Sequence, residues 1–224
     1  MASVQDDWRS FFVTAQIVTG ATERAERLLR LHTGAGFNTF DWIGPTENRL
    51  SDILRDFLDP KGDHGQGDVF LRLALEKLVP LRVDALPVQS DLCVVSREAH
   101  TYNGRRLDLL LDFGKTVIGI ENKPFASESL DQLSDYASYL SDRSRGEYCL
   151  IFLHGPAMAA QSIAPDRRRA LEAEGRFRSV PYMSSTEPSL HDWLTGCVAA
   201  CRSEKVRWFL IDFAEYVATQ FNPP

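Results

Sequence analysis

The sequence is short of cysteine, and the few cysteines it has lie at the wrong spacing for common zinc sites. None of its four cysteines forms a Cys-x-x-Cys pair, the spacing of a zinc ribbon. Cys197 and Cys201 are spaced i, i+4, which is typical of two small apolar residues on one helix face. We therefore predict no structural zinc.

Long apolar runs and leader segments are also missing. No stretch approaches the roughly 18 apolar residues of a membrane span. The first residues include Asp6 and Asp7 and no apolar segment, so we predict no signal peptide, no membrane association and a cytoplasmic protein. P-loop, helix-turn-helix and zinc-finger signatures are absent, and no internal repeat is visible.

The composition that remains is that of an ordinary folded domain. Of the 224 residues, 44% are hydrophobic and 25% are charged. A chain of this length can bury one sizeable core, so we predict a single domain over residues 1–224.

Residues 105–123 are the most informative stretch, because they read as a β-hairpin. The two arms, residues 105–112 and 117–123, are rich in Leu, Ile and Val, as buried strands are. Between them, Gly114 and Lys115 suit a two-residue turn with glycine at the first central position.

This turn predicts which side chains share a face. Leu110 should face Gly119 and Asp108 should face Glu121, with Lys123 two residues further along. Asp108, Glu121 and Lys123 then project from one face, and Gly119 leaves room beside them. The opposite face is predicted to be core, formed by Leu107, Leu109, Leu111, Ile118 and Ile120.

Two carboxylates opposed across a hairpin repel each other, which a purely structural role does not explain. Mg²⁺ or Mn²⁺ would explain the arrangement, since such ions take oxygen ligands and often only one or two protein carboxylates. Lys123 would lie next to a metal-bound water. The alternative is an edge hairpin in which Lys123 simply neutralises Asp108 and Glu121.

Asp108 followed by Glu121-Asn122-Lys123 resembles the core of the PD-(D/E)XK nuclease superfamily. Leu107 stands where the literal motif has proline, a departure that many members share. The ordered set of motifs is more specific than the lone Glu-x-Lys.

Three further segments match that superfamily in the right order. Glu47 lies in the first turn of a helix predicted over residues 46–58, although compensation of the helix dipole would also explain it. The loop around His64 resembles a segment of bacterial members, or it holds two helices together. Gln132 and Tyr136 match the Gln-x-x-x-Tyr helix of RecB-like nucleases, or form an ordinary surface pair.

The resemblance implies an α/β fold with a restriction-endonuclease-like αβββαβ core, a mixed central sheet flanked by helices, and extra N- and C-terminal helices. Residues 1–44 would be a helical extension, 45–155 the nuclease core, and 156–224 a C-terminal strand and helices. The predicted elements are helices at 6–31 (with a break at Gly20), 46–58, 69–79, 129–140, 191–201 and 206–221, and strands at 86–95, 105–112, 117–123, 148–153 and 180–185, with a loop at 34–45.

The resemblance also implies roles for individual residues. Asp108, Glu121, the backbone carbonyl of Asn122 and Glu47 would hold Mg²⁺ or Mn²⁺, and Lys123 would position or activate water. The residues expected to bind substrate are Gln132, Tyr136, His64 and Arg106. Some RecB-like nucleases carry an iron–sulfur cluster, but the cysteine spacing here does not fit, so we predict none.

The function implied is hydrolysis of phosphodiester bonds, with DNA favoured over RNA, 5′-phosphate and 3′-hydroxyl products, and a role in phage defence or DNA repair. Two alternatives stay open, a non-catalytic nucleic-acid-binding scaffold of the same fold and an RNA-cleaving nuclease or toxin. A second copy of the chain or a defence-system protein is a possible further partner. These residues do not decide between them.

The net charge of −6 is unusual for a protein that binds a polyanion. The local field decides such binding, and Arg105, Arg106 and Lys123 fall within the hairpin. The carboxylates of a metal site would also be neutralised by the bound ion.

Overall fold

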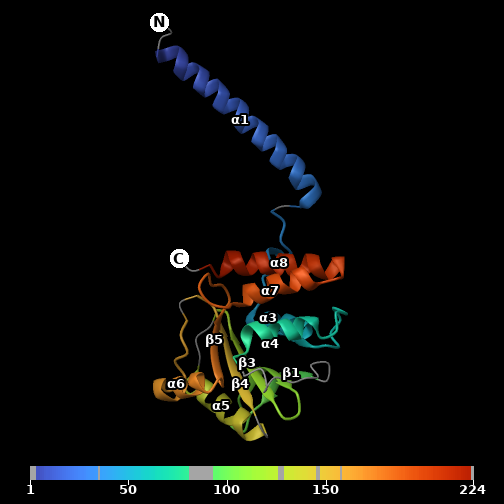
Figure 1. The fold of residues 1–224 in the computed structure, drawn as a ribbon, viewed down its shortest axis with the longest axis vertical. Coiled ribbons are helices and arrows are strands. Elements are labelled where there is room, and N and C mark those ends of the chain that lie inside the picture. Colours follow the sequence, from blue (N-terminus) through green and yellow to red (C-terminus); the bar gives the residue numbers. More distant parts are fainter. Residues whose placement is uncertain are drawn as a thin grey trace. The chain divides into compact units, whose positions relative to one another are not determined.

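The chain divides into two compact units, Met1–Asn38 and Thr39–Pro224. The structure, a computed structural model, describes residues 4–34, 36–80, 93–125, 129–144, 147–156 and 158–222 (Figure 1). The first unit is one helix, α1 (Val4–Thr33), which continues through Gly20. The predicted break at Gly20 is therefore wrong, since a single glycine costs a helix only about 1 kcal/mol.

The second unit is built on a five-stranded mixed sheet in the order β1-β2-β3-β4-β5. The first three strands are antiparallel, and β3, β4 and β5 are parallel. The strands are β1 (Val94–His100), β2 (Arg106–Asp112), β3 (Val117–Lys123), β4 (Tyr148–His154) and β5 (Phe177–Pro181). Every residue of β3 except Lys123 is buried, as expected for a central strand.

Helices cover both faces of this sheet, so the unit has three layers (Figure 1). One face is covered by α3 (Glu47–Leu58), α4 (Val69–Leu78), α7 (Leu190–Ala200) and α8 (Glu204–Gln220), with the short α2 (Thr39–Ile43) on α8. The other face is covered by α5 (Gln132–Arg143) and α6 (Pro165–Ala173).

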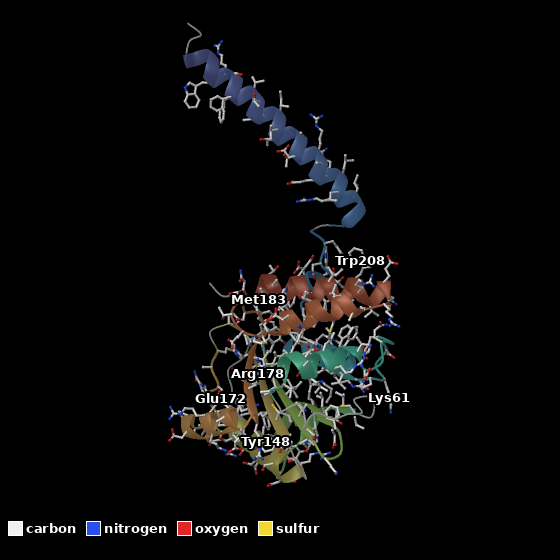
Figure 2. All side chains as sticks on the ribbon, in the orientation of Figure 1. Lys61, Tyr148, Glu172, Arg178, Met183 and Trp208 are labelled. Carbon is white, nitrogen blue, oxygen red and sulfur yellow. The ribbon has the colours of Figure 1, made fainter. Side chains whose placement is uncertain are left out.

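Polar contacts join α4 to its neighbour α7 and to the sheet. The indole of Trp193 on α7 donates to the Phe70 carbonyl on α4 at 2.9 Å. Arg178 on β5, labelled in Figure 2, donates to the Lys77 carbonyl near the end of α4 at 3.3 Å. The edge strand β5, α4 and α7 are therefore linked to one another, and β3 is the central strand of the sheet that they pack with.

The predicted αβββαβ core is confirmed in the order α3, β1, β2, β3, α5, β4. The predicted hairpin register is confirmed as well, since Leu110 faces Gly119. Thr46 caps α3, its side chain accepting from Arg49 N–H at 3.3 Å.

Several boundaries differ from the prediction. The loop expected at 34–45 contains α2, because Phe40 stacks against the aromatic side chains of α8. Of the strand predicted at 86–95, residues 86–92 lie outside the described residues, and β1 runs on to His100 because it pairs with β2. The added strand lies at 177–181 rather than 180–185, since its pairing partner is β4. Among the described residues, no helix is long and apolar enough to cross a membrane.

Candidate active site

The hairpin brings Asp108 and Glu121 to its open end. Regular pairing of β2 with β3 extends to Leu109 opposite Ile120. One step further, the backbone N–H of Asn122 donates to the Asp108 carboxylate at 2.8 Å. The Asp108 side chain is therefore held by the strand that carries Glu121 and Lys123.

Two predictions about this face are wrong. Leu107 does not lie on the same face as Leu109 and Leu111, and Gly119 does not leave open room beside the acids. Leu107 belongs to the core beneath α5, and a Cβ on Gly119 would lie 2.7 and 2.8 Å from methyl carbons of Leu140 and Leu107. Regular pairing of β1 with β2 is interrupted at this point, because Glu98, a residue with φ of +50°, and Asp108 do not pair. Because Gly119 has no side chain, Leu107 and Leu140 can pack closely against β3.

Lys123 joins the hairpin to α3. Its Nζ lies 2.7 Å from Glu47 Oε1 and 3.1 Å from Glu121 Oε1. Because Glu47 is the first residue of α3, the Thr46 cap that starts the helix also fixes where this carboxylate stands. Residues 76 positions apart in the sequence thus meet at one ammonium group.

Glu121 is in an unfavourable position for a carboxylate. Its side chain is 1% exposed, and its Oε2 atom is buried without a hydrogen-bond partner. Burial and the charge of Asp108 raise the pKa of Glu121 to about 8, although Lys123 acts in the opposite direction. An uncompensated buried charge is costly, and a cation at Oε2 would offset that cost.

The other two charged groups respond to the same environment. Burial is the main cause that raises the pKa of Asp108 above its ordinary value. For Lys123, burial acts downward, but the carboxylates of Glu121 and Glu47 together raise the pKa above its usual range. Lys123 is therefore an ammonium ion at neutral pH, held between the side chains of Glu47 and Glu121.

Gln132 and Tyr136 form a buried chain of hydrogen bonds that ends on Glu121. Gln132 Nε2 donates to Glu121 Oε1 at 2.7 Å and lies 3.0 Å from the Tyr136 hydroxyl. That hydroxyl donates to the Arg106 carbonyl at 2.7 Å. Gln132 thus orients the Glu121 oxygen that Lys123 also contacts, and Tyr136 holds Gln132 in place.

Asn122 is held equally firmly on the other side of β3. Its side chain is fully buried, donating to Ser51 Oγ on α3 at 2.8 Å and accepting from the Tyr182 hydroxyl at 2.7 Å. No local pattern in the sequence points to Tyr182, whereas Ser51 lies four residues after Glu47 and thus near the same face of α3. These contacts fix the backbone between Glu121 and Lys123.

Replacing Tyr182 with phenylalanine should lower the free energy of unfolding by about 1–3 kcal/mol, because it leaves the buried Asn122 amide oxygen without a donor. Denaturant unfolding followed by circular dichroism measures this loss. The matched control is Tyr102→Phe, since Tyr102 is 73% exposed. Equal stability of the two variants would contradict the role given to the Tyr182 hydroxyl.

Arg97 on β1 is a further residue at this end of the hairpin that sequence reasoning missed. Its guanidinium donates to the Asp108 carbonyl at 2.8 Å and to Asp52 of α3 at 2.9 Å. It also lies 3.7 Å from the Asp108 carboxylate. An arginine on an amphipathic strand carries no sequence signal of its own, so only the packing of α3 against β1 reveals it.

The structure does not bring the side chains of Arg106 and His64 to this cluster. Arg106 forms an exposed ion pair with Glu98 at 2.8 Å, and only its backbone carbonyl contacts the network. His64 is buried, with Nε2 3.0 Å from the Asp59 carbonyl and Nδ1 accepting from Gln66 N–H at 3.0 Å. Both His64 nitrogens are thus used within its own loop, and contact with phosphate would require one of these bonds to break.

The residues present fit a hard divalent ion with few protein ligands. Within the described part of the chain, no group of three or more His, Cys, Asp or Glu side chains is arranged to hold a metal by itself. Mg²⁺ does not need such a group, because it completes its shell with water and substrate phosphate. The unpartnered Oε2 of Glu121, beside Asp108, is the kind of oxygen that such an ion uses.

The α/β fold and this cluster of two acids and a lysine define a nuclease-like class of protein. The model of the PD-(D/E)XK nuclease superfamily matches residues 37–215, so the chain belongs to that family. Members typically use divalent metal ions, and the family is one of phosphodiester-cleaving nucleases. Searches of the curated proteins and of the solved structures found no match.

Proposed function

We propose that this protein is a Mg²⁺- or Mn²⁺-dependent nuclease that hydrolyses phosphodiester bonds in DNA. The observation that carries the proposal is the buried Oε2 of Glu121, which has no hydrogen-bond partner and lies in a cluster with Asp108 and Lys123. A buried carboxyl group with a strongly raised pKa and a specific charged neighbour is typical of a functional site.

In the proposed site, Asp108, Glu121 and the backbone carbonyl of Asn122 would hold the ion, with Glu47 completing the site directly or through water. A bound ion would acidify a water molecule and stabilise charge on the phosphate. Lys123, an ammonium group in this arrangement, orients the attacking water and neutralises phosphate charge. Gln132 keeps Glu121 in place at 2.7 Å.

The products proposed are 5′-phosphate and 3′-hydroxyl ends, so the attack forms a new P–O bond and breaks the bond from phosphorus to the 3′ oxygen. The attacking water releases a proton to solvent, and the leaving 3′ oxygen takes one up. A role in phage defence or DNA repair, in the cytoplasm, goes with this proposal through the family resemblance.

A cleavage assay tests the proposal. The pure protein is incubated with plasmid, linear duplex, single-stranded DNA and RNA, in Mg²⁺, in Mn²⁺ and in chelator. We expect metal-dependent cutting of DNA that Asp108→Ala and Lys123→Ala each lower by at least about 100-fold. The matched controls are Lys115→Ala, in the turn of the same hairpin, and Asp142→Ala on α5, both at exposed positions.

Each outcome separates one alternative from the others. Cutting of RNA alone would replace DNA by RNA as substrate and leave the site assignment intact. No cutting, together with a melting temperature that neither ion changes, would contradict the metal site and favour the scaffold. Cutting that survives Asp108→Ala and Lys123→Ala would place the active site elsewhere.

A further inference from the structure

The helix α1 carries a large apolar surface that its own unit does not bury. Nine large apolar side chains are each more than half exposed: Trp8, Phe11, Phe12, Val13, Ile17, Val18, Leu28, Leu29 and Leu31. A single helix has no other element in its unit to pack against, and isolated helices depend on packing of an amphipathic face for most of their stability. Such a surface marks an interaction site.

Four of these nine residues lie on one stripe of α1 that has a heptad spacing. Residues at alternate steps of three and four positions share a helix face, and here the described side chains of that stripe are Trp8, Phe11, Ala15, Val18, Thr22, Ala25 and Leu29. Six of these seven are apolar. A stripe repeating every 3.5 residues is the surface with which a helix packs along another helix.

The distribution of side-chain size along the stripe favours an antiparallel partner of the same sequence. The bulky rings lie near the start, where Trp8, Phe11 and Phe12 contact one another with centroids 5.8–6.4 Å apart. In an antiparallel pair centred between positions 16 and 17, Trp8 lies opposite Ala25 and Phe11 opposite Thr22. A parallel pair would instead set each ring against its own copy and leave the small residues apart.

Charge supports the same partner and orientation. The helix contains four acidic and four basic residues, so it is neutral in a chain of net charge −6 and does not repel a copy of itself. Residues 4–19 have two aspartates and one arginine, whereas residues 20–33 have two glutamates and three arginines. Antiparallel pairing places the acidic half beside the basic half.

The area is also adequate. Stripe and flanking side chains that are about 60% exposed, three of them aromatic, offer on the order of 700 Å² per helix, close to the roughly 800 Å² per partner of a stable interface. We propose that α1 forms an antiparallel two-helix interface with α1 of a second copy of this chain, so that the protein is a homodimer.

Sedimentation equilibrium of the full chain tests the proposal without reference to cleavage. We expect a mass of twice 25.2 kDa at micromolar concentration. Phe11→Glu and Val18→Glu, which place a charge in the stripe, should weaken association at least about tenfold. Gln16→Glu is the matched control, because it adds the same group on the opposite face of α1. Equal thermal unfolding of the second unit in all variants excludes general misfolding.

Cross-linking tests the orientation. Trp8→Cys combined with Ala25→Cys should give a disulfide-linked dimer on mild oxidation, whereas Ala25→Cys alone should not, since the two copies of position 25 lie far apart in the antiparallel pair. The four native cysteines are buried and do not interfere. A monomer at all concentrations, a dimer insensitive to Phe11→Glu, or cross-linking by Ala25→Cys alone would each overturn the proposal. A monomer that binds anionic lipid vesicles would assign α1 to a membrane surface instead.

Discussion

Replacing Glu121 with glutamine is expected to lower metal-dependent cleavage by about 1,000-fold or more and to raise the stability of the metal-free protein. The loss of activity follows because the substitution removes a charged ion ligand and keeps the shape of the side chain. The gain in stability follows because the wild-type carboxylate is 1% exposed and has one oxygen without a partner. Initial cleavage rates and denaturant unfolding measure the two effects.

The gain in stability should depend on pH in a defined direction. The pKa of Glu121 is about 8 in the folded protein, against an ordinary value of 4.5. Below pH 4.5 this residue is protonated in both states and carries no penalty, and between pH 4.5 and 8 the folded state becomes progressively less stable because only the unfolded state ionises freely. Wild-type protein should thus lose stability from pH 5 to pH 8 relative to Glu121→Gln.

Glu187→Gln is the matched control for this experiment, because Glu187 is exposed. It should change neither cleavage nor the pH dependence of unfolding. Retained cleavage in Glu121→Gln would contradict the proposed ligand, and a variant less stable than wild type at pH 8 would contradict the charge argument. Added Mg²⁺ should stabilise wild type more than Glu121→Gln, since the variant lacks one of the charged ligands of the ion.

Replacing Lys123 with methionine is expected to have the second large effect, and here stability and activity should separate. The variant should lose about 3 kcal/mol of stability, because the carboxylates of Glu47 and Glu121 lose the cation that lies 2.7 and 3.1 Å away. Millimolar Mg²⁺ should recover much of that stability by supplying positive charge. Cleavage should stay at least about 100-fold reduced, because the ion does not replace the ammonium group that orients water.

Melting temperature and cleavage rate, each measured with and without Mg²⁺, give four numbers for the variant. Lys115→Met is the control for the loss of one lysine from the hairpin. Recovery of both stability and cleavage by Mg²⁺ would show that Lys123 acts only by neutralising charge. Unchanged stability in Lys123→Met would mean that the two ion pairs contribute nothing to the fold.

Most features formed by residues close together in the sequence were predicted correctly, and most features that depend on distant residues were not. The hairpin register was correct because a two-residue turn fixes which positions face each other over the next few residues. The predicted side of Leu107 was wrong, since the alternation of side chains along β2 does not hold across Asp108, where the pairing with β1 is interrupted. Strict alternation of side chains applies only where the pairing of the strands is regular.

The cluster shows the same division. The proximity of Gln132 and Tyr136 could be predicted because both lie on one helix. The hydrogen bond from Gln132 to Glu121 depends on how α5 packs on β3. Arg97 donates to the Asp108 carbonyl, and Tyr182 donates to the Asn122 side chain. No local sequence pattern predicts either contact.

The family, the αβββαβ order and the acids and lysine of the hairpin could be predicted before any packing was known, because motif spacing, turn chemistry and apolar periodicity are local properties. Only the tertiary structure decided which oxygen of Glu121 is left without a partner, which group restrains Asn122, and that the His64 side chain lies away from the acids. Those outcomes depend on burial and on contacts between distant segments, which exist only once the layers have packed.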